Sequence, residues 1–185
     1  MTGGFVRAAR ASDAAALARA QVASWESTLT GLVPGEVLAE LTSPAARQAW
    51  QTRWLEAISN PPTSRHRVHV AVSAAGDGPV LGFAAAGPAT DDDCSPGTDG
   101  ELYELHVLPA AAGDEHGHDS RLLHAVAGSL SEDGFRTAFT WALSADSCRL
   151  EFLLAAGWAQ DGTQSILDMG VKVPMVRLHA QLSPG

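Results

Sequence analysis

Cysteine is scarce in this sequence, which has only Cys94 and Cys148 among its 185 residues. Two cysteines are too few for a disulfide framework, and they lack the paired spacing of a zinc site, so a reducing compartment fits. No stretch approaches the roughly 18 consecutive apolar residues that a membrane-spanning helix needs. The first residues show no basic segment followed by an apolar core, so no secretory signal is evident and a cytoplasmic location is expected.

Positive charge is also scarce, because 12 lysines and arginines face 21 aspartates and glutamates, which gives a formal net charge of −9. Nucleic acids and anionic membranes would be repelled by this field, so neither is expected as a main partner. A neutral or cationic small substrate is easier to accommodate. The hydrophobic content of 45% is typical of a globular protein, and no shift in composition marks a boundary, so residues 1–185 are predicted to form a single domain.

The periodicity of apolar residues predicts both helices and strands. Strand patterns cover residues 5–9, 67–75, 80–89, 101–109, 135–143, 165–169 and 173–182. Helix patterns cover residues 14–25, 34–42, 46–59, 120–134 and 146–158. Between them, residues 90–100 are small, polar and acidic, and they are predicted to form a mobile loop. This order is typical of an α+β (mixed α/β) domain with one central sheet.

Three segments carry recognisable motifs, and the first is ELYELHVLP at residues 101–109. It resembles the central strand of the GCN5-related N-acetyltransferases, which commonly reads E-L-x-x-L-x-V-x-P. Residues 146–158, DSCRLEFLLAAGW, are similar to that family's N-x-x-A-x-x-F-Y-x-x-x-G-F segment, with Phe152 and Gly157 at matching positions. Residues 24–34 look like the acceptor-side helices of many bacterial members. The resemblance implies a mostly antiparallel, splayed central sheet flanked by helices.

The same resemblance implies acetyl-coenzyme A as the cofactor and a primary amine as the acceptor. In the family, a turn of the form Q/R-x-x-G-x-G/A closes on the pyrophosphate at a helix N-terminus, where backbone N–H groups are unpaired. The splayed strand before that turn offers its backbone groups to the pantetheine arm. The cofactor-binding residues implied in this chain are Leu105, His106, Val107, Gly113, Gly117, Asp146 and Phe152.

The turn itself, GDEHGHD at residues 113–119, departs most from the family pattern. Counted from the following helix only Gly117 matches, and counted from the preceding strand Gly113 falls on the first glycine. Three carboxylates in the turn would repel a pyrophosphate. Three interpretations stay open: a turn that still binds coenzyme A through backbone N–H groups, a turn that no longer binds it well, and a divalent metal site built on His116 and His118 with Asp114, Glu115 or Asp119. No residue is assigned to a metal.

Two glutamates are candidates for the general base that acetyl transfer to an amine requires. Glu101 aligns with the position from which some family members supply their base, and Glu104 is the second candidate. Strict alternation along a strand places them on opposite faces, so only one could face the acceptor pocket. His106 shares its face with Glu104 and could act in a relay, although a histidine in a strand is more often packed than catalytic.

Two residues in the later segment differ from the family pattern. Leu153 stands where many members have a tyrosine that protonates the departing thiolate, which leaves water, the thiol itself or Tyr103. Asp146 replaces an asparagine that contacts the pantetheine arm. The prediction is therefore an N-acetyltransferase acting on a small molecule or peptide, and the alternative is a catalytically silent binding or assembly protein on the same scaffold. The apolar residues 171–182 would allow a homodimer.

Overall fold

The computed structural model describes residues 5–73, 78–111 and 117–183. The helices are α1 (Ala14–Leu29), α2 (Gly35–Leu41), α3 (Pro44–Ser59), α4 (His118–Glu132) and α5 (Ser147–Ala155), with short 3-10 turns η1 (Ala11–Asp13) and η2 (Pro109–Ala111). The strands are β1 (Phe5–Ala8), β2 (Arg67–Val72), β3 (Val80–Pro88), β4 (Asp99–Val107), β5 (Thr137–Leu143), β6 (Ala159–Asp168) and β7 (Lys172–Gln181).

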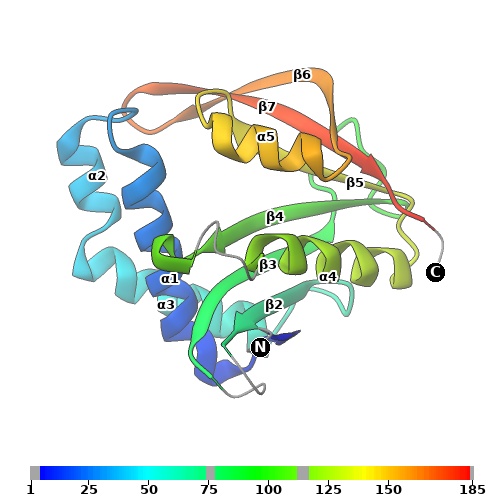
Figure 1. Cartoon of the computed structure of the whole chain (residues 1–185), viewed down its shortest axis with the longest axis horizontal. Coiled ribbons are helices and arrows are strands. Elements are labelled where there is room, and N and C mark those ends of the chain that lie inside the picture. The colour runs from blue at the N-terminus through cyan, green and yellow to red at the C-terminus, as the bar shows by residue number, and fades with distance from the viewer. Residues whose placement is uncertain (1–4, 74–77, 112–116, 184–185) are drawn as a thin grey trace.

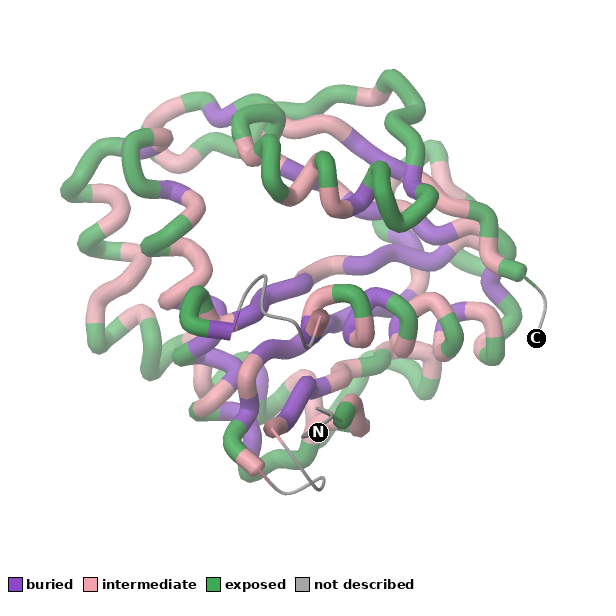
Figure 2. Tube along the Cα trace, in the orientation of Figure 1, coloured by how far each residue is buried: buried purple, intermediate pink, exposed green. Residues whose placement is uncertain are grey.

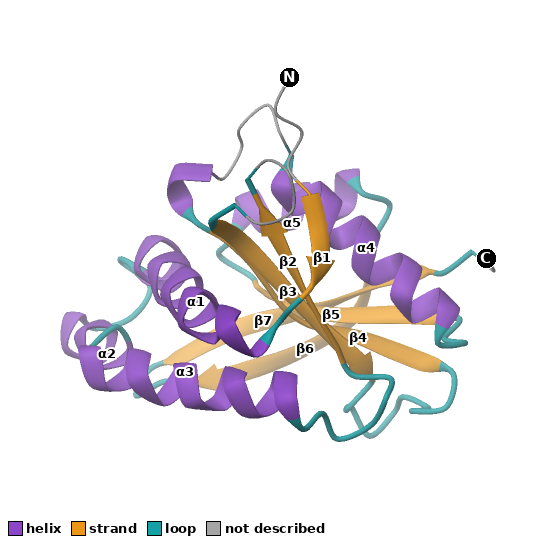
Figure 3. Ribbon diagram, turned by 90° about the horizontal axis from the view of Figure 1, so that it is seen from below, coloured by secondary structure: helices purple, strands orange, loops and turns teal. Residues whose placement is uncertain are grey.

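The strands form one seven-stranded sheet in the order β1-β2-β3-β4-β5-β7-β6. Every neighbouring pair is antiparallel except β4 and β5, which are parallel. Helices α1 to α3 lie on one side of the sheet and α4 on the other (Figure 3). The predicted α+β architecture with a mostly antiparallel sheet is confirmed.

The sheet splays at its centre, between β4 and β5. The two strands pair only from Asp99 to Leu102, and the last pair joins Leu102 to Thr140. The Thr140 hydroxyl donates a hydrogen bond of 2.9 Å to the Leu102 carbonyl and closes this junction. Beyond it β4 continues on β3 alone and β5 on β7 alone, so the two halves diverge toward the side where α1 and α2 lie (Figure 1). One edge of β4 therefore faces a gap inside the molecule.

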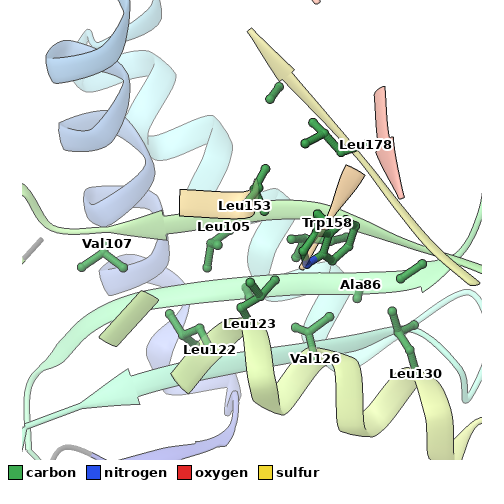
Figure 4. Close-up of a cluster of buried hydrophobic side chains, with 14 of the residues drawn as sticks. Ala86, Leu105, Val107, Leu122, Leu123, Val126, Leu130, Leu153, Trp158 and Leu178 are labelled. Atoms are coloured by element: carbon green, nitrogen blue, oxygen red, sulfur yellow. The ribbon is translucent and has the colours of Figure 1, made fainter. Parts of the chain in front are cut away.

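Two apolar clusters hold the sheet between its helices, and the buried residues follow the central strands (Figure 2). On one face, Leu122, Val126 and Leu130 of α4 point toward the sheet and meet Trp158, which follows α5 (Figure 4). These leucines are 0% exposed. The other face packs α1 and α3 against β2 and β3 through residues that include Leu17, Trp54 and Phe83. Burial of apolar surface on both faces is the main stabilising contribution to the fold.

A β-bulge in β4 changes which side chains share a face. Ala85 pairs with Glu104 and Ala86 pairs with Leu102, so Tyr103 is an extra residue in β4. The extra residue reverses the alternation beyond it. Glu101 and Glu104 consequently lie on the same face, and the expectation that they face opposite ways was wrong. A bulge leaves no signal in a pattern of alternating residues, which is why strict alternation failed here.

The element boundaries agree with the sequence patterns to within about three residues, except that α1 runs on to Leu29 and β6 begins earlier than expected. The N-cap of α3 is Ser43, whose side chain accepts a hydrogen bond from the Ala46 N–H. Gly134 and Gly157 follow α4 and α5 with φ of 86° and 88°, as the predicted helix ends require. Strand β6 begins at Ala159, six residues before the predicted start, because nearly all of its residues are exposed and no apolar alternation marks them.

Candidate functional site

A cavity of about 420 Å³ occupies the splay of the sheet. Its lining residues come from α1, β4, β5, the start of α5 and the β6–β7 hairpin. They are Ser24, Trp25, Thr28, Leu29, Leu102, Tyr103, Glu104, Leu105, His106, Thr140, Trp141, Ala142, Leu143, Asp146, Arg149, Leu153, Leu167, Met169 and Met175. Aromatic, aliphatic and thioether groups form most of this wall, with few charged groups among them. Such a lining suits a small ligand held by apolar contacts and oriented by a few polar groups.

Glu104 and His106 form a hydrogen-bonded pair on the wall of this cavity. His106 Nε2 lies 2.5 Å from Glu104 Oε2. The imidazole is 8% exposed and is surrounded by rings, with the centroid of Phe83 at 5.3 Å and that of Trp25 at 6.4 Å. Among the described residues nothing accepts from or donates to His106 Nδ1. The expected shared face of these two residues is confirmed, and the arrangement puts a carboxylate on the cavity wall with an imidazole holding it in place.

Glu101, the other candidate base, does not line the cavity. Its Oε2 accepts two hydrogen bonds from Thr90, at 2.7 Å from the hydroxyl and 2.9 Å from the backbone N–H. Burial raises the pKa of this carboxyl, and the two bonds from Thr90 offset part of that rise. Glu101 therefore holds the beginning of the loop between β3 and β4.

The acidic loop that follows Thr90 is also held, by a residue that sequence reasoning did not single out. Arg177 of β7 is 4% exposed and donates to Asp91 at 2.9 Å, to Asp93 at 2.6 and 2.7 Å, and to Asp161 at 2.7 Å. The prediction of a mobile loop overlooked this arginine. The only signal in the sequence was an arginine flanked by the apolar residues Val176 and Leu178 within a strand.

The same arginine bears on metal binding. Within residues 5–73, 78–111 and 117–183, one group of side chains is close enough to hold a metal ion, namely Asp91, Asp93 and Cys94. The guanidinium of Arg177 already donates to the two carboxylates and lies 3.8 Å from the Cys94 sulfur. A cation placed among these ligands would be repelled by the arginine, so this group is a salt-bridge cluster.

A second cavity, of about 200 Å³, adjoins the first beside the start of α4 and α5. Three of the predicted cofactor residues, Val107, Asp146 and Phe152, line it, while Leu105 and His106 line the first. Asp146 lines both. The structure thus brings these five residues together along one path through the splay.

The two predicted glycines of the turn differ in how they can be placed. Gly113 lies outside the described residues, as do Asp114, Glu115 and His116 of the metal interpretation. Gly117 immediately precedes α4 with a left-handed φ of 53°, which favours glycine. Of the remaining turn residues, His118 is buried and Asp119 lines the second cavity.

Asp146 has a structural role in addition to its place on the path. It is the N-cap of α5, and its Oδ1 accepts a hydrogen bond of 3.0 Å from the Arg149 N–H. Aspartate and asparagine cap helices about equally well, which explains how one replaces the other at this position.

Arg149 is the main residue of the site that sequence reasoning missed. It occupies the alanine position of the N-x-x-A-x-x-F pattern, and that substitution was the available signal. Its Nη2 donates a hydrogen bond of 2.7 Å to the Leu105 carbonyl, on the edge of β4 that β5 leaves unpaired. Burial lowers the pKa of Arg149, although the charges of Asp146, Asp119 and Glu104 oppose that effect.

Packing accounts for the leucine at the position where the family has its general acid, and hydrogen bonding accounts for the orientation of Tyr103. Leu153 is 2% exposed and belongs to the apolar cluster between α4, α5 and the sheet. The hydroxyl of Tyr103 donates a hydrogen bond of 2.5 Å to the Pro88 carbonyl, and burial raises its pKa to about 12. In this arrangement the tyrosine proton is directed at the backbone of β3.

Comparison with known proteins agrees with this geometry. No protein-family model matches the chain. The uncharacterized N-acetyltransferase YuaI of Bacillus subtilis (strain 168) is 29% identical over 138 residues, which cover 75% of this chain and 70% of the relative. The PaiA N-acetyltransferase of Thermoplasma acidophilum, solved in complex with coenzyme A, superposes with a TM-score of 0.69 at 16% identity over 96% of this chain and 98% of its own. The ribosomal-protein-alanine N-acetyltransferase of Brucella melitensis gives a TM-score of 0.67 at 19% identity, covering 96% and 99%.

The splayed sheet, with its parallel junction between β4 and β5, is the fold of these acetyltransferase structures. The chain therefore shares the fold of these N-acetyltransferases, and its sequence is similar to that of YuaI. Among the described residues, no helix is long and apolar enough to cross a membrane.

Proposed function

We propose that the protein is an acetyl-coenzyme A-dependent N-acetyltransferase, which transfers the acetyl group directly to a primary amine of a small molecule or peptide. The observation that carries the proposal is the hydrogen-bonded Glu104–His106 pair on the wall of the splay cavity. Coenzyme A in the PaiA structure, on the same fold, supports the choice of cofactor.

The residues along the path fit such a cofactor. The divergence of β4 from β5 leaves backbone groups of β4 without strand partners, as a polar pantetheine arm requires. Val107, Asp146 and Phe152 line the adjoining cavity, which leads from the beginning of α4 into the splay. Acetyl-coenzyme A would supply an activated thioester there.

The chain's own groups provide a base and positioning. An amine arrives at neutral pH mostly as an ammonium ion, so it must lose a proton before its nitrogen can attack the thioester carbonyl. Glu104 accepts that proton, and His106, whose Nε2 lies 2.5 Å from the carboxylate, orients it. Trp25 and Trp141 line the same cavity and limit how the acceptor can lie. The departing thiolate takes up the proton that the new amide nitrogen loses.

The test compares two matched glutamate variants, both changed to the isosteric amide. In Glu104→Gln the cavity loses its carboxylate, and kcat/KM with the best amine of an acceptor panel should fall by about 10² to 10⁴. In Glu101→Gln the side chain can still accept from Thr90, so kcat/KM should stay within a few-fold of the unaltered enzyme.

Equal losses in the two variants would contradict the assignment of Glu104 as the base. If coenzyme A binds and no amine in the panel is acetylated, the catalytically silent binding protein becomes the better description.

A further inference from the structure

Arg149 stands in the part of the splay where the cofactor path passes. It lines both cavities, and its guanidinium spans from α5 to the unpaired edge of β4, where it bonds the Leu105 carbonyl. The smaller alanine of the family pattern would leave that carbonyl accessible. An arm that runs along β4 and uses this carbonyl must first displace the arginine.

The hydrogen bonding of Arg149 is incomplete. A guanidinium has five N–H donors, and the structure gives this side chain one hydrogen bond, to a neutral carbonyl. Asp146, Asp119 and Glu104 influence its charge, yet no carboxylate among the described residues lies within ion-pairing distance of it. Arg177, a buried arginine, is by contrast surrounded by three carboxylates. A partly buried cation with spare donors is a binding group for an anion.

The second cavity indicates where such an anion would lie. Arg149 shares it with Asp119, at the beginning of α4, and with Phe152, whose ring centroid is 6.0 Å from the guanidinium carbon. The formal charge of the chain is −9, and Asp119 and Asp146 place two of its carboxylates at this cavity, so an anion needs a compensating cation there.

We propose that Arg149 is a cofactor-binding residue that leaves the Leu105 carbonyl when coenzyme A enters and then pairs with its pyrophosphate in the second cavity. The inference rests on the proposed function, because it takes coenzyme A as the ligand. While it bonds the Leu105 carbonyl, the arginine weakens binding of the uncharged pantetheine arm. Once it has moved, its charge strengthens binding of the pyrophosphate. These two effects have opposite signs, so they can be separated with ligands that carry or lack phosphate.

Isothermal titration calorimetry of Arg149→Ala with three ligands provides the test: acetyl-coenzyme A, its 3′-dephospho form, and phosphate-free acetyl-pantetheine. We expect the variant to bind the first two about tenfold more weakly than the unaltered protein, because a charge-assisted bond to phosphate is lost. Acetyl-pantetheine should bind as tightly or several-fold more tightly, since no bond to Leu105 has to be broken.

Arg136→Ala is the control, because it removes the same charge from an exposed side chain that lines neither cavity. It should change all three affinities by less than about twofold. Thermal melting of both variants checks that each is folded.

Several outcomes would overturn the inference. Tighter binding of all three ligands would make Arg149 only an obstruction, and equal weakening of all three would make it only structural. A loss confined to the ligand with a 3′-phosphate would refute the pyrophosphate assignment. If the unaltered protein bound none of the ligands, the proposed function would fail together with the inference, whereas binding without the expected contrast would remove the inference alone.

Discussion

Arg177 offers the most direct test of how the acidic loop is held against the sheet. Replacing it with methionine keeps most of the aliphatic stem but removes the guanidinium that joins Asp91, Asp93 and Asp161. The loop then loses its anchor to β7, and its carboxylates are left next to one another without a cation. Stability should fall for both reasons.

The burial of the partners sets the size of the effect. Breaking a buried ion pair by removing one partner costs about 3–5 kcal/mol. Arg177 has a side-chain exposure of 5% and Asp161 of 17%, but Asp93 is 62% exposed and adds little. We therefore expect a loss of about 3 kcal/mol, at the low end of that range. For a chain of this length such a loss lowers Tm by about 6–12 °C.

The effect should depend on pH in a defined direction. The hydrogen bonds from Arg177 hold the pKa of Asp93 below its usual range, and bonds from Thr163 and Arg177 outweigh burial to do the same for Asp161. Carboxyls with a depressed folded-state pKa stabilise the protein above their unfolded pKa, and this contribution is lost as the pH falls through the folded value. The variant lacks that contribution, so the difference in Tm should be largest at neutral pH and shrink below about pH 4.

Differential scanning calorimetry from pH 3 to 8 measures both features. Arg67→Met is the control, because it breaks a single ion pair, between Arg67, which is 44% exposed, and Asp133, which is 10% exposed, so it should cost less than the loss of the three pairs of Arg177. A Tm loss in the Arg177 variant no larger than in this control, or one that does not change with pH, would refute the reasoning.

Two further predictions concern packing around the site. Leu122→Ala removes a side chain that is 0% exposed from the cluster between α4 and the sheet, so it should destabilise by about 2–5 kcal/mol in urea titration while kcat per folded molecule stays unchanged. A change in kcat under conditions where the variant is fully folded would mean that the packing of α4 influences the geometry of the site. Gly82→Ala places a Cβ 2.6 Å from the His106 carbonyl, so β4 must move, and cofactor affinity should fall by more than about tenfold with a modest Tm loss. Unchanged affinity in the folded variant would show that the strand can move without disturbing the path.

Much of this protein follows from local patterns in its sequence. Alternating and helical spacing, together with caps such as Ser43 and glycines such as Gly157, determined nearly every element, because backbone preferences and the burial of one face act over a few residues. The ELYELHVLP strand and the segment from Asp146 to Trp158 indicated the likeness to N-acetyltransferases and most of the residues along the proposed cofactor path.

Only the tertiary structure decided which of those residues can act together. The bulge at Tyr103 put Glu101 and Glu104 on one face, and the contact with Thr90 then separated the anchoring glutamate from the one beside His106. Arg149 bonds a carbonyl 44 residues away, and Arg177 reaches carboxylates more than 80 residues away. Pairing across such separations depends on how the strands diverge and pack, and no local pattern in the chain records it.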